Sequence, residues 1–214
     1  QGDKRTSWHY QRYIKNYLRC VQAVDENVGR LLAYLDKSDL AKDTVVIYSS
    51  DQGFYLGEHG WYDKRWIYEE SLKMPLVMRW PEKIKPGTKI AKLTQNIDFA
   101  PFFLEAAGAD VPQEIQGSSL MPLFRKQDAP WRKAIYYHYY EAGGHGVPAH
   151  FGVRDERYKL VHFPRTKEWN LVDLKEDPQE MQSFHHDPAY KETLDQMRAK
   201  LSDLQKKYGV ETSL

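Results

Sequence analysis

The sequence predicts an α/β fold followed by a small antiparallel sheet that one helix covers. Three patterns indicate this order: a long amphipathic helix leads into a short apolar strand, four aromatic and β-branched runs follow later, and a second amphipathic helix comes last. A polar stretch with a proline at 126–130 separates the two parts. We therefore expect domains at residues 1–128 and 129–214.

The first part alternates helices with short strands. Residues 7–37 carry apolar side chains three and four positions apart, which predicts one long helix with Cys20 in the core. The run 44–48 is apolar on both faces, as expected for a buried strand. After it we expect one or two helical turns at 66–72, a strand at 75–80 and a turn at 81–87. A helix at 96–107 follows, and Gly108 ends it.

The second part resembles an antiparallel meander. Its strands are short aromatic and β-branched runs separated by Gly, Pro or charged turns, at 135–140, 151–153, 158–163 and 169–174. Residues 188–208 then form a charged amphipathic helix with one apolar face. A small sheet covered by this helix is the predicted arrangement.

Composition and charge exclude several classes of protein. The 214 residues are 41% hydrophobic, and 31 Lys plus Arg are balanced by 30 Asp plus Glu. A net charge of +1 gives no electrostatic footprint for a nucleic acid or an anionic membrane. The longest apolar run is far shorter than the roughly 20 residues of a membrane span. We therefore expect no nucleic-acid partner and no membrane span.

Polar side chains follow the strand at 44–48, at the end of a strand where open α/β sheets bind ligands. Asp51 and Gln52 offer adjacent side-chain oxygens, which calcium prefers, although calcium takes about 6 to 8 ligands. Lys64 and Arg65 add positive charge suited to an anionic group beside a metal. On the residues alone, a strand-ending turn at Asp51 to Gly53 is the favoured interpretation over a metal site.

A longer string of residues distinguishes these alternatives. Asp51-Gln52-Gly53, then 56–60, then Asp63-Lys64-Arg65 closely resembles the second metal-binding segment of type I sulfatases, in the alkaline phosphatase superfamily. The resemblance also includes 68–71, 74–77, 24–32, 96–101, 116–120, 153–160 and 171–178. The resemblance covers only the C-terminal half of sulfatases of this family. Within the family, the sequence resembles bacterial glycan sulfatases of the N-acetylglucosamine-6-sulfatase type.

The resemblance implies a fold, a metal and roles for residues. The fold is the C-terminal part of an alkaline-phosphatase-like α/β sandwich, followed by the small antiparallel sheet and helix. Asp51 and Gln52 match calcium ligands, and Lys64 matches a catalytic lysine that contacts the sulfate. The expected activity is that of a sulfuric ester hydrolase.

The family's nucleophile is absent from the sequence. Sulfatases use a formylglycine made from the first residue of a Cys/Ser-x-Pro-x-Arg segment, whereas Cys20 is followed by Val21 and Gln22. The resemblance therefore implies a fragment, inactive alone, whose partner is the missing N-terminal half with the formylglycine. A periplasmic, lysosomal or extracellular location is implied in the same way.

The substrate implied is a sulfated glycan or sugar. Asp63, Arg65 and His150 are predicted substrate-binding residues, together with Lys64. His59, His138 and His145 each have two interpretations: the side chain binds substrate, or it is an ordinary loop or surface residue. For His59, a role in ordering the loop is favoured. The sugar and the position of its sulfate are not predicted.

Two other functions fit the same residues. A phosphonate or phosphodiester hydrolase of the superfamily would share the metal geometry, and transition-metal dependence would favour it. A noncatalytic binding lobe would keep the fold without a nucleophile.

Overall fold

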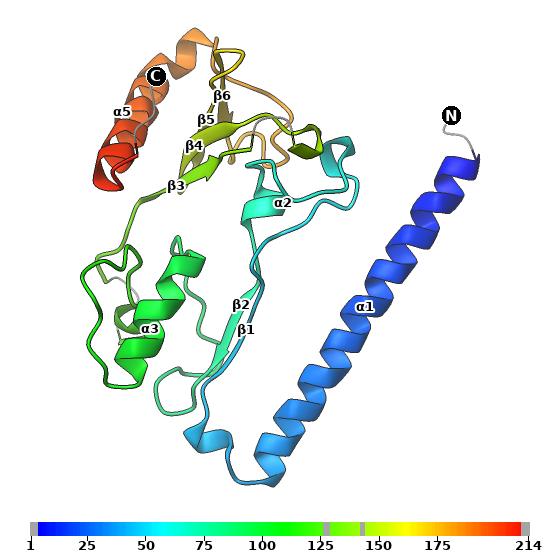
Figure 1. The fold of residues 1–214 in the computed structure, drawn as a ribbon, viewed down its shortest axis with the longest axis vertical. Coiled ribbons are helices and arrows are strands. Elements are labelled where there is room, and N and C mark those ends of the chain that lie inside the picture. The colour runs from blue at the N-terminus through cyan, green and yellow to red at the C-terminus, as the bar shows by residue number, and fades with distance from the viewer. Residues whose placement is uncertain (1–3, 126–128, 142–143, 211–214) are drawn as a thin grey trace. The chain divides into compact units, whose positions relative to one another are not determined.

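The computed structural model describes residues 4–125, 129–141 and 144–210 (Figure 1). The chain divides into two compact units, residues 1–49 with 75–88, and residues 50–74 with 89–214. The domain boundary predicted between residues 128 and 129 stays a prediction, since 126–128 lie outside the described residues. None of the described helices is long and apolar enough to cross a membrane.

The first unit contains one long helix and a two-stranded antiparallel ribbon. Helix α1 (Lys4–Lys37) confirms the predicted amphipathic helix, and the short 3₁₀ turn η1 (Ala41–Asp43) follows it. Strands β1 (Val46–Ser49) and β2 (Leu76–Arg79) pair in antiparallel register. Both predicted strands are therefore present, each within two residues of its expected limits. No residue of β1 is buried, so the expectation of a buried strand at 44–48 was wrong, because β1 pairs only with β2 in a two-stranded ribbon.

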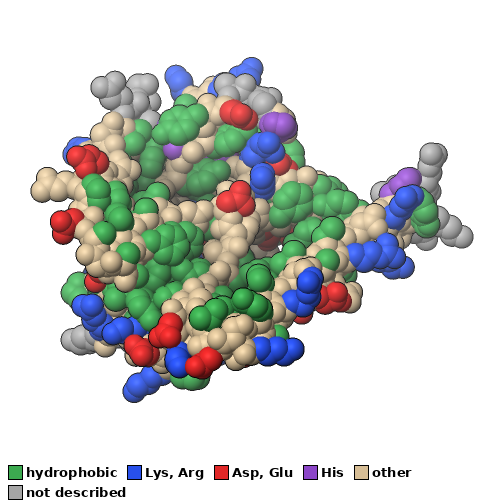
Figure 2. All heavy atoms as spheres, turned by 60° about the horizontal axis from the view of Figure 1, so that its bottom comes forward, with side chains coloured by type: hydrophobic (Ala, Val, Ile, Leu, Met, Phe, Trp, Pro, Cys, Tyr) green, Lys and Arg blue, Asp and Glu red, His purple; other side chains and the backbone are tan. Residues whose placement is uncertain are grey.

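The apolar stripe of α1 is exposed, as the rod that ends in grey atoms on the right of Figure 2 shows. Leu18 and Leu31 are 55% and 65% exposed. Within this unit, neither of the described strands β1 and β2 packs extensively against α1. Cys20 is exposed as well, so the prediction that it lies in the core was wrong, because helical spacing alone does not supply a partner for the stripe.

The second unit contains the predicted meander and its covering helix. Four strands pair antiparallel in the order β3-β4-β5-β6: β3 (Ala134–Tyr139), β4 (His150–Asp155), β5 (Tyr158–Phe163) and β6 (Glu168–Asp173). The turn η5 (Pro188–Tyr190) leads into α5 (Lys191–Lys207). Met197 and Leu201 of α5 pack with Phe151, Val153 and Leu160 in the core. This arrangement confirms the prediction.

The opposite face of the sheet supports the segment that follows Asp51. Ile67 is 1% exposed and packs against Val161 and Phe163 of β5. This contact places η2 (Glu58–Gly60) and α2 (Glu69–Leu72) in the same unit as the sheet. The helical turns predicted at 66–72 shorten to four residues.

A short helical region completes the second unit. The predicted helix at 96–107 is divided into η3 (Asn96–Asp98) and α3 (Phe99–Ala106), and α4 (Met121–Arg125) follows. The buried carboxylate of Asp98 accepts the N–H groups of Gln95 and Ser118 and pairs with Arg132. A residue of η3 is thereby anchored to the segment that enters β3.

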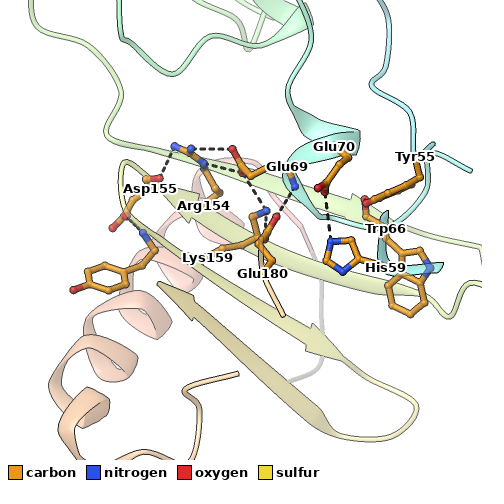
Figure 3. Close-up of polar contacts among 10 residues, drawn as sticks. Tyr55, His59, Trp66, Glu69, Glu70, Arg154, Asp155, Lys159 and Glu180 are labelled. Carbon is orange, nitrogen blue, oxygen red and sulfur yellow. Dashed lines mark hydrogen bonds and ion pairs between the residues drawn. The ribbon is translucent and has the colours of Figure 1, made fainter. Parts of the chain in front are cut away.

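Charged side chains join α2 to the sheet (Figure 3). Arg154 of β4 pairs with Glu69, and Lys159 of β5 lies 3.1 Å from the same carboxylate. Glu180 accepts from Lys159 at 2.6 Å and from the Glu69 N–H at 2.6 Å. The first residue of α2 is thus held by three side chains from elsewhere in the unit.

Candidate active site

Asp51, Gln52 and Gly53 follow β1 in the chain and approach α2 closely. The Gly53 N–H donates to the Ser71 carbonyl at 2.8 Å. A Cβ at position 53 would lie 2.0 Å from the Glu70 carbonyl oxygen, so the contact requires glycine. The turn therefore sets Gln52 directly against the last part of α2.

The side-chain amide of Gln52 has one orientation. Its Nε2 donates to the Ser71 carbonyl at 2.8 Å and to the Ser71 hydroxyl at 2.6 Å, and lies 3.1 Å from the Lys64 carbonyl. Carbonyl oxygens only accept hydrogen bonds, so the nitrogen must face them. Among the described residues, no hydrogen bond occupies the amide oxygen Oε1.

The donors at Asp51 and Gln52 fit a hard cation. Asp51 is exposed, and its carboxylate lies next to Gln52 in the chain, while its main-chain carbonyl accepts from Asn96 at 2.8 Å. Carboxylate and amide oxygens are the ligand types that calcium takes. In the described ranges no three His, Cys, Asp or Glu side chains gather into a metal cluster. These two residues could supply part of a calcium shell only.

The backbone of the Asp63-Lys64-Arg65 segment is fixed at each residue. The carbonyls of Asp63, Lys64 and Arg65 accept from the Tyr55 N–H, the Ser71 hydroxyl and the Tyr137 hydroxyl, at 2.8, 2.6 and 2.8 Å. The side chain of Lys64 is exposed. Asp63 and Arg65 form an ion pair and are largely buried. The structure thus brings the Lys64 backbone to Gln52, 12 residues away in the sequence.

His150 lies on the face of the sheet that also carries Phe163, and it is completely buried. Its ring stacks with Trp66 at 5.6 Å, and Nδ1 lies 2.8 Å from the Pro148 carbonyl. That carbonyl only accepts, so Nδ1 carries the proton. Burial lowers the pKa of His150 and so favours the neutral ring, in which Nε2 is an acceptor.

Buried polar atoms without a partner occur in this region. Among the described residues, Asp63 Oδ2, Trp66 Nε1 and His150 Nε2 accept or donate no hydrogen bond. Buried polar groups are nearly always paired in folded proteins. These three atoms have hydrogen-bonding capacity that the described residues leave unused.

The other three histidines have different surroundings. His59 stacks on Tyr68 at 4.1 Å and lies 3.5 Å from Glu70, contacts that order the loop, as the favoured interpretation states. His138 contacts Tyr136. Because side chains alternate along a strand, it lies on the face of β3 opposite to Tyr137. His145 is exposed at φ 58° in the 3₁₀ turn η4 (Gly144–Gly146).

Sequence reasoning missed one residue that joins the site together. Ser71 is 0% exposed and bonds both Gln52 and Lys64. Its only sequence signal was its place in the string that resembles sulfatases. No spacing rule relates residues 52, 64 and 71, because they meet through tertiary folding.

Two family models match the chain. The model described as "Sulfatase" matches residues 1–109, and the model described as "N-sulphoglucosamine sulphohydrolase, C-terminal" matches residues 57–207. Together they cover the candidate site, the whole meander and α5.

Individual relatives agree with these matches. An N-acetylglucosamine-6-O-sulfatase of Bacteroides thetaiotaomicron is 46% identical over an alignment of 213 positions, and the match covers 97% of this chain and 38% of that protein. The multifunctional alkaline phosphatase superfamily protein PehA of Trinickia caryophylli is 30% identical over an alignment of 188 positions, and the match covers 81% of this chain and 36% of PehA. The chain therefore spans less than half the length of these relatives.

A solved structure has the same fold. BT4656 in complex with its substrate D-glucosamine-2-N,6-O-disulfate superposes with a TM-score of 0.93 at 46% identity, over 98% of this chain and 43% of that one. This likeness confirms the predicted fold class, the C-terminal part of an alkaline-phosphatase-like α/β sandwich with its small sheet and helix.

Proposed function

The chain belongs to the sulfatase family, and we propose on that premise that it forms the C-terminal part of a sulfuric ester hydrolase acting on a sulfated carbohydrate. The observation that carries the proposal is the junction at Ser71, which holds Gln52 beside the backbone of Lys64 and leaves its amide oxygen without a hydrogen bond to any described residue. The names of the B. thetaiotaomicron relative and of the BT4656 complex support a sulfated glucosamine as substrate class.

We assign two roles to residues at the reacting group. Asp51 and Gln52 would hold calcium through side-chain oxygens, and the bound ion would supply positive charge beside the sulfate. The exposed ammonium of Lys64 would stabilise negative charge that develops on the sulfate ester as its bond breaks. The nucleophile, a formylglycine, would come from the N-terminal half, which we propose as the partner of this chain.

We assign substrate recognition to Asp63, Arg65 and His150. The unpartnered Asp63 Oδ2 could accept from a sugar hydroxyl, and the neighbouring Arg65 guanidinium could donate to one. His150 Nε2 is also an acceptor, because the ring proton lies on Nδ1. The complete burial of His150 gives a substrate less access to it than to Asp63 or Arg65. We also propose a periplasmic, lysosomal or extracellular location, which the resemblance to glycan sulfatases supports.

The metal assignment is tested in the longer enzyme with Asp51→Ala and Gln52→Ala. Both variants should weaken calcium binding, measured by calorimetry on metal-free protein, and Asp51→Ala should abolish turnover of glucosamine 6-sulfate. Asp110→Ala, at an exposed aspartate away from the site, is the matched control and should change neither value. Near-normal calcium affinity and turnover in Asp51→Ala would exclude the assignment.

A phosphonate or phosphodiester hydrolase is the second candidate. The similarity to PehA, a multifunctional member of the alkaline phosphatase superfamily, favours it. The two candidates are separated by turnover of a sulfate ester, a phosphonate monoester and a phosphate diester at equal concentration. Faster turnover of the phosphorus esters, with dependence on a transition metal, would replace the first candidate.

A further inference from the structure

Ser71 connects two parts of the candidate active site through a single buried hydroxyl. Its Oγ donates to the Lys64 carbonyl at 2.6 Å and accepts from Gln52 Nε2 at 2.6 Å. Its own carbonyl accepts from Gln52 Nε2 and from the Gly53 N–H, each at 2.8 Å. Ser71 therefore contacts the predicted metal ligand, the residue after it and the predicted sulfate-binding lysine.

The direction of each hydrogen bond follows from its partner. The Lys64 carbonyl has no proton, so the Ser71 hydroxyl must donate to it. The hydroxyl oxygen then keeps lone pairs for one N–H of Gln52, and the Ser71 carbonyl takes the other. With both amide protons used, Oε1 of Gln52 must face away from Ser71.

The position of Ser71 is itself fixed by the surrounding fold. The Glu69 N–H, two residues earlier in α2, donates to the buried carboxylate of Glu180. Gly53 lets the opposing backbone approach α2 closely enough for the hydrogen bonds to form. Ser71 therefore serves as a rigid point from which Gln52 and Lys64 are oriented.

We propose that Ser71 is a positioning residue of the active site. It turns Gln52 Oε1 toward the metal and holds the backbone of Lys64 beside that ligand. The inference rests on the proposed function, because it presumes that Gln52 binds calcium. Loss of the hydroxyl should weaken calcium binding and lower turnover, although Ser71 would touch neither calcium nor substrate.

The experiment uses the longer enzyme with Ser71→Ala, and Ser119→Ala as the matched control. Ser119 Oγ accepts from the Met121 N–H at the start of α4, so its removal also costs a helix-terminal hydrogen bond. Calcium affinity is measured by calorimetry on metal-free protein. Ser71→Ala should weaken it roughly 10- to 100-fold, as expected for a group that orients a metal ligand, and Ser119→Ala should leave it unchanged.

Two further variants separate positioning from a general loss of structure. In a Gln52→Ala background, Ser71→Ala should cause no additional loss of calcium affinity, because no amide remains to be oriented. Gln52→Glu should also bind calcium more weakly despite its added negative charge, since a second carboxylate oxygen would face the Ser71 and Lys64 carbonyls. This variant leaves Ser71 intact and tests the same geometry if Ser71→Ala does not fold.

The outcomes distinguish this inference from the proposed function. Unchanged calcium affinity in Ser71→Ala, with weakened affinity in Gln52→Ala, overturns the positioning role and keeps the metal site. Tighter calcium binding by Gln52→Glu also overturns the positioning role. Unchanged affinity in Gln52→Ala would instead remove Gln52 from the proposed metal site.

Discussion

Lys159 and Glu180 form an ion pair 2.6 Å apart in which the two side chains are 0% and 1% exposed. Glu69 and Arg154 complete a group of two positive and two negative charges that joins the sheet to α2 (Figure 3). Burial raises the pKa of Glu180, although Lys159 acts against it. Burial would also raise the pKa of Glu69, but Lys159 and Arg154 together lower it.

Replacing Lys159 with Met should destabilise the protein in a pH-dependent way. Glu180 would remain buried without its closest positive partner, a change that costs about 3 to 5 kcal/mol of the free energy of unfolding near pH 7.5. Because a raised pKa lets Glu180 take up a proton at lower pH, the loss should shrink near pH 5.5. Urea unfolding at both pH values measures this effect.

Two controls accompany that measurement. Lys191→Met removes an exposed lysine at the start of α5 and should change the free energy of unfolding little. The double variant Lys159→Met/Glu180→Gln should recover part of the loss, since no unpaired charge remains. An equal loss at both pH values would contradict an ionised Glu180.

Lys64→Ala should lower kcat/KM for a sulfate ester by about a hundredfold or more, by analogy with removal of one donor to a developing anion. Calcium affinity should stay unchanged, because the ammonium is not a metal ligand. Steady-state kinetics and calorimetry give the two values. Lys73→Ala, at an exposed lysine beyond α2, is the control, and an equal loss there would show that the effect is not specific to Lys64.

Asp63→Asn should discriminate between substrates. If the carboxylate accepts from a sugar hydroxyl, kcat/KM for a sulfated glucosamine should fall roughly 10- to 100-fold, as expected for a hydrogen bond to a charged group. A small aryl sulfate has no such hydroxyl, so its turnover should change much less. Equal losses on both substrates would assign Asp63 a structural role through its ion pair with Arg65.

Asp173 should contribute stability that depends on acidity. Bonds from Arg157 lower the pKa of Asp173 from its ordinary 3.8 to about 2. The folded state keeps the carboxylate ionised where the unfolded chain is protonated, so this contribution is present above about pH 4 and declines toward pH 2. The stability difference between wild type and Asp173→Asn should therefore shrink over that range in thermal unfolding.

The comparison needs a control because many carboxylates titrate between pH 4 and 2. Asp195→Asn removes an exposed aspartate of α5 and should show no such pH-dependent difference from the wild type. A constant difference for Asp173→Asn across the range would contradict the lowered pKa.

Periodicity predicted the fold wherever a segment's own pattern determines its structure. The strand expected at 158–163 has the limits of β5, and the helix expected at 7–37 differs from α1 by three residues at its start. Cys20 was placed wrongly because an amphipathic pattern does not identify which surface packs against it. Local patterns therefore predicted helices and strands better than they predicted which side chains are buried.

The residues of the candidate site also fall into two groups, those proposed from the sequence and those recognised only in the structure. Asp51, Gln52 and Lys64 came from a resemblance to a family string, and their roles stay predictions. Ser71 lies in the same string, which gave it no role, and Glu180 lies outside it; their partners lie 7 to 111 residues away in the sequence. Such contacts form only when the tertiary fold brings these residues together.

The close approach at Gly53 limits how this site can be redesigned. Any other amino acid would place a Cβ 2.0 Å from the Glu70 carbonyl, so a library that diversifies position 53 would mostly yield displaced loops. Efforts to change the metal preference should therefore vary Asp51 and Gln52 while position 53 stays glycine. The same constraint makes this glycine a sensitive criterion for judging whether a distant homologue keeps the same ligand geometry.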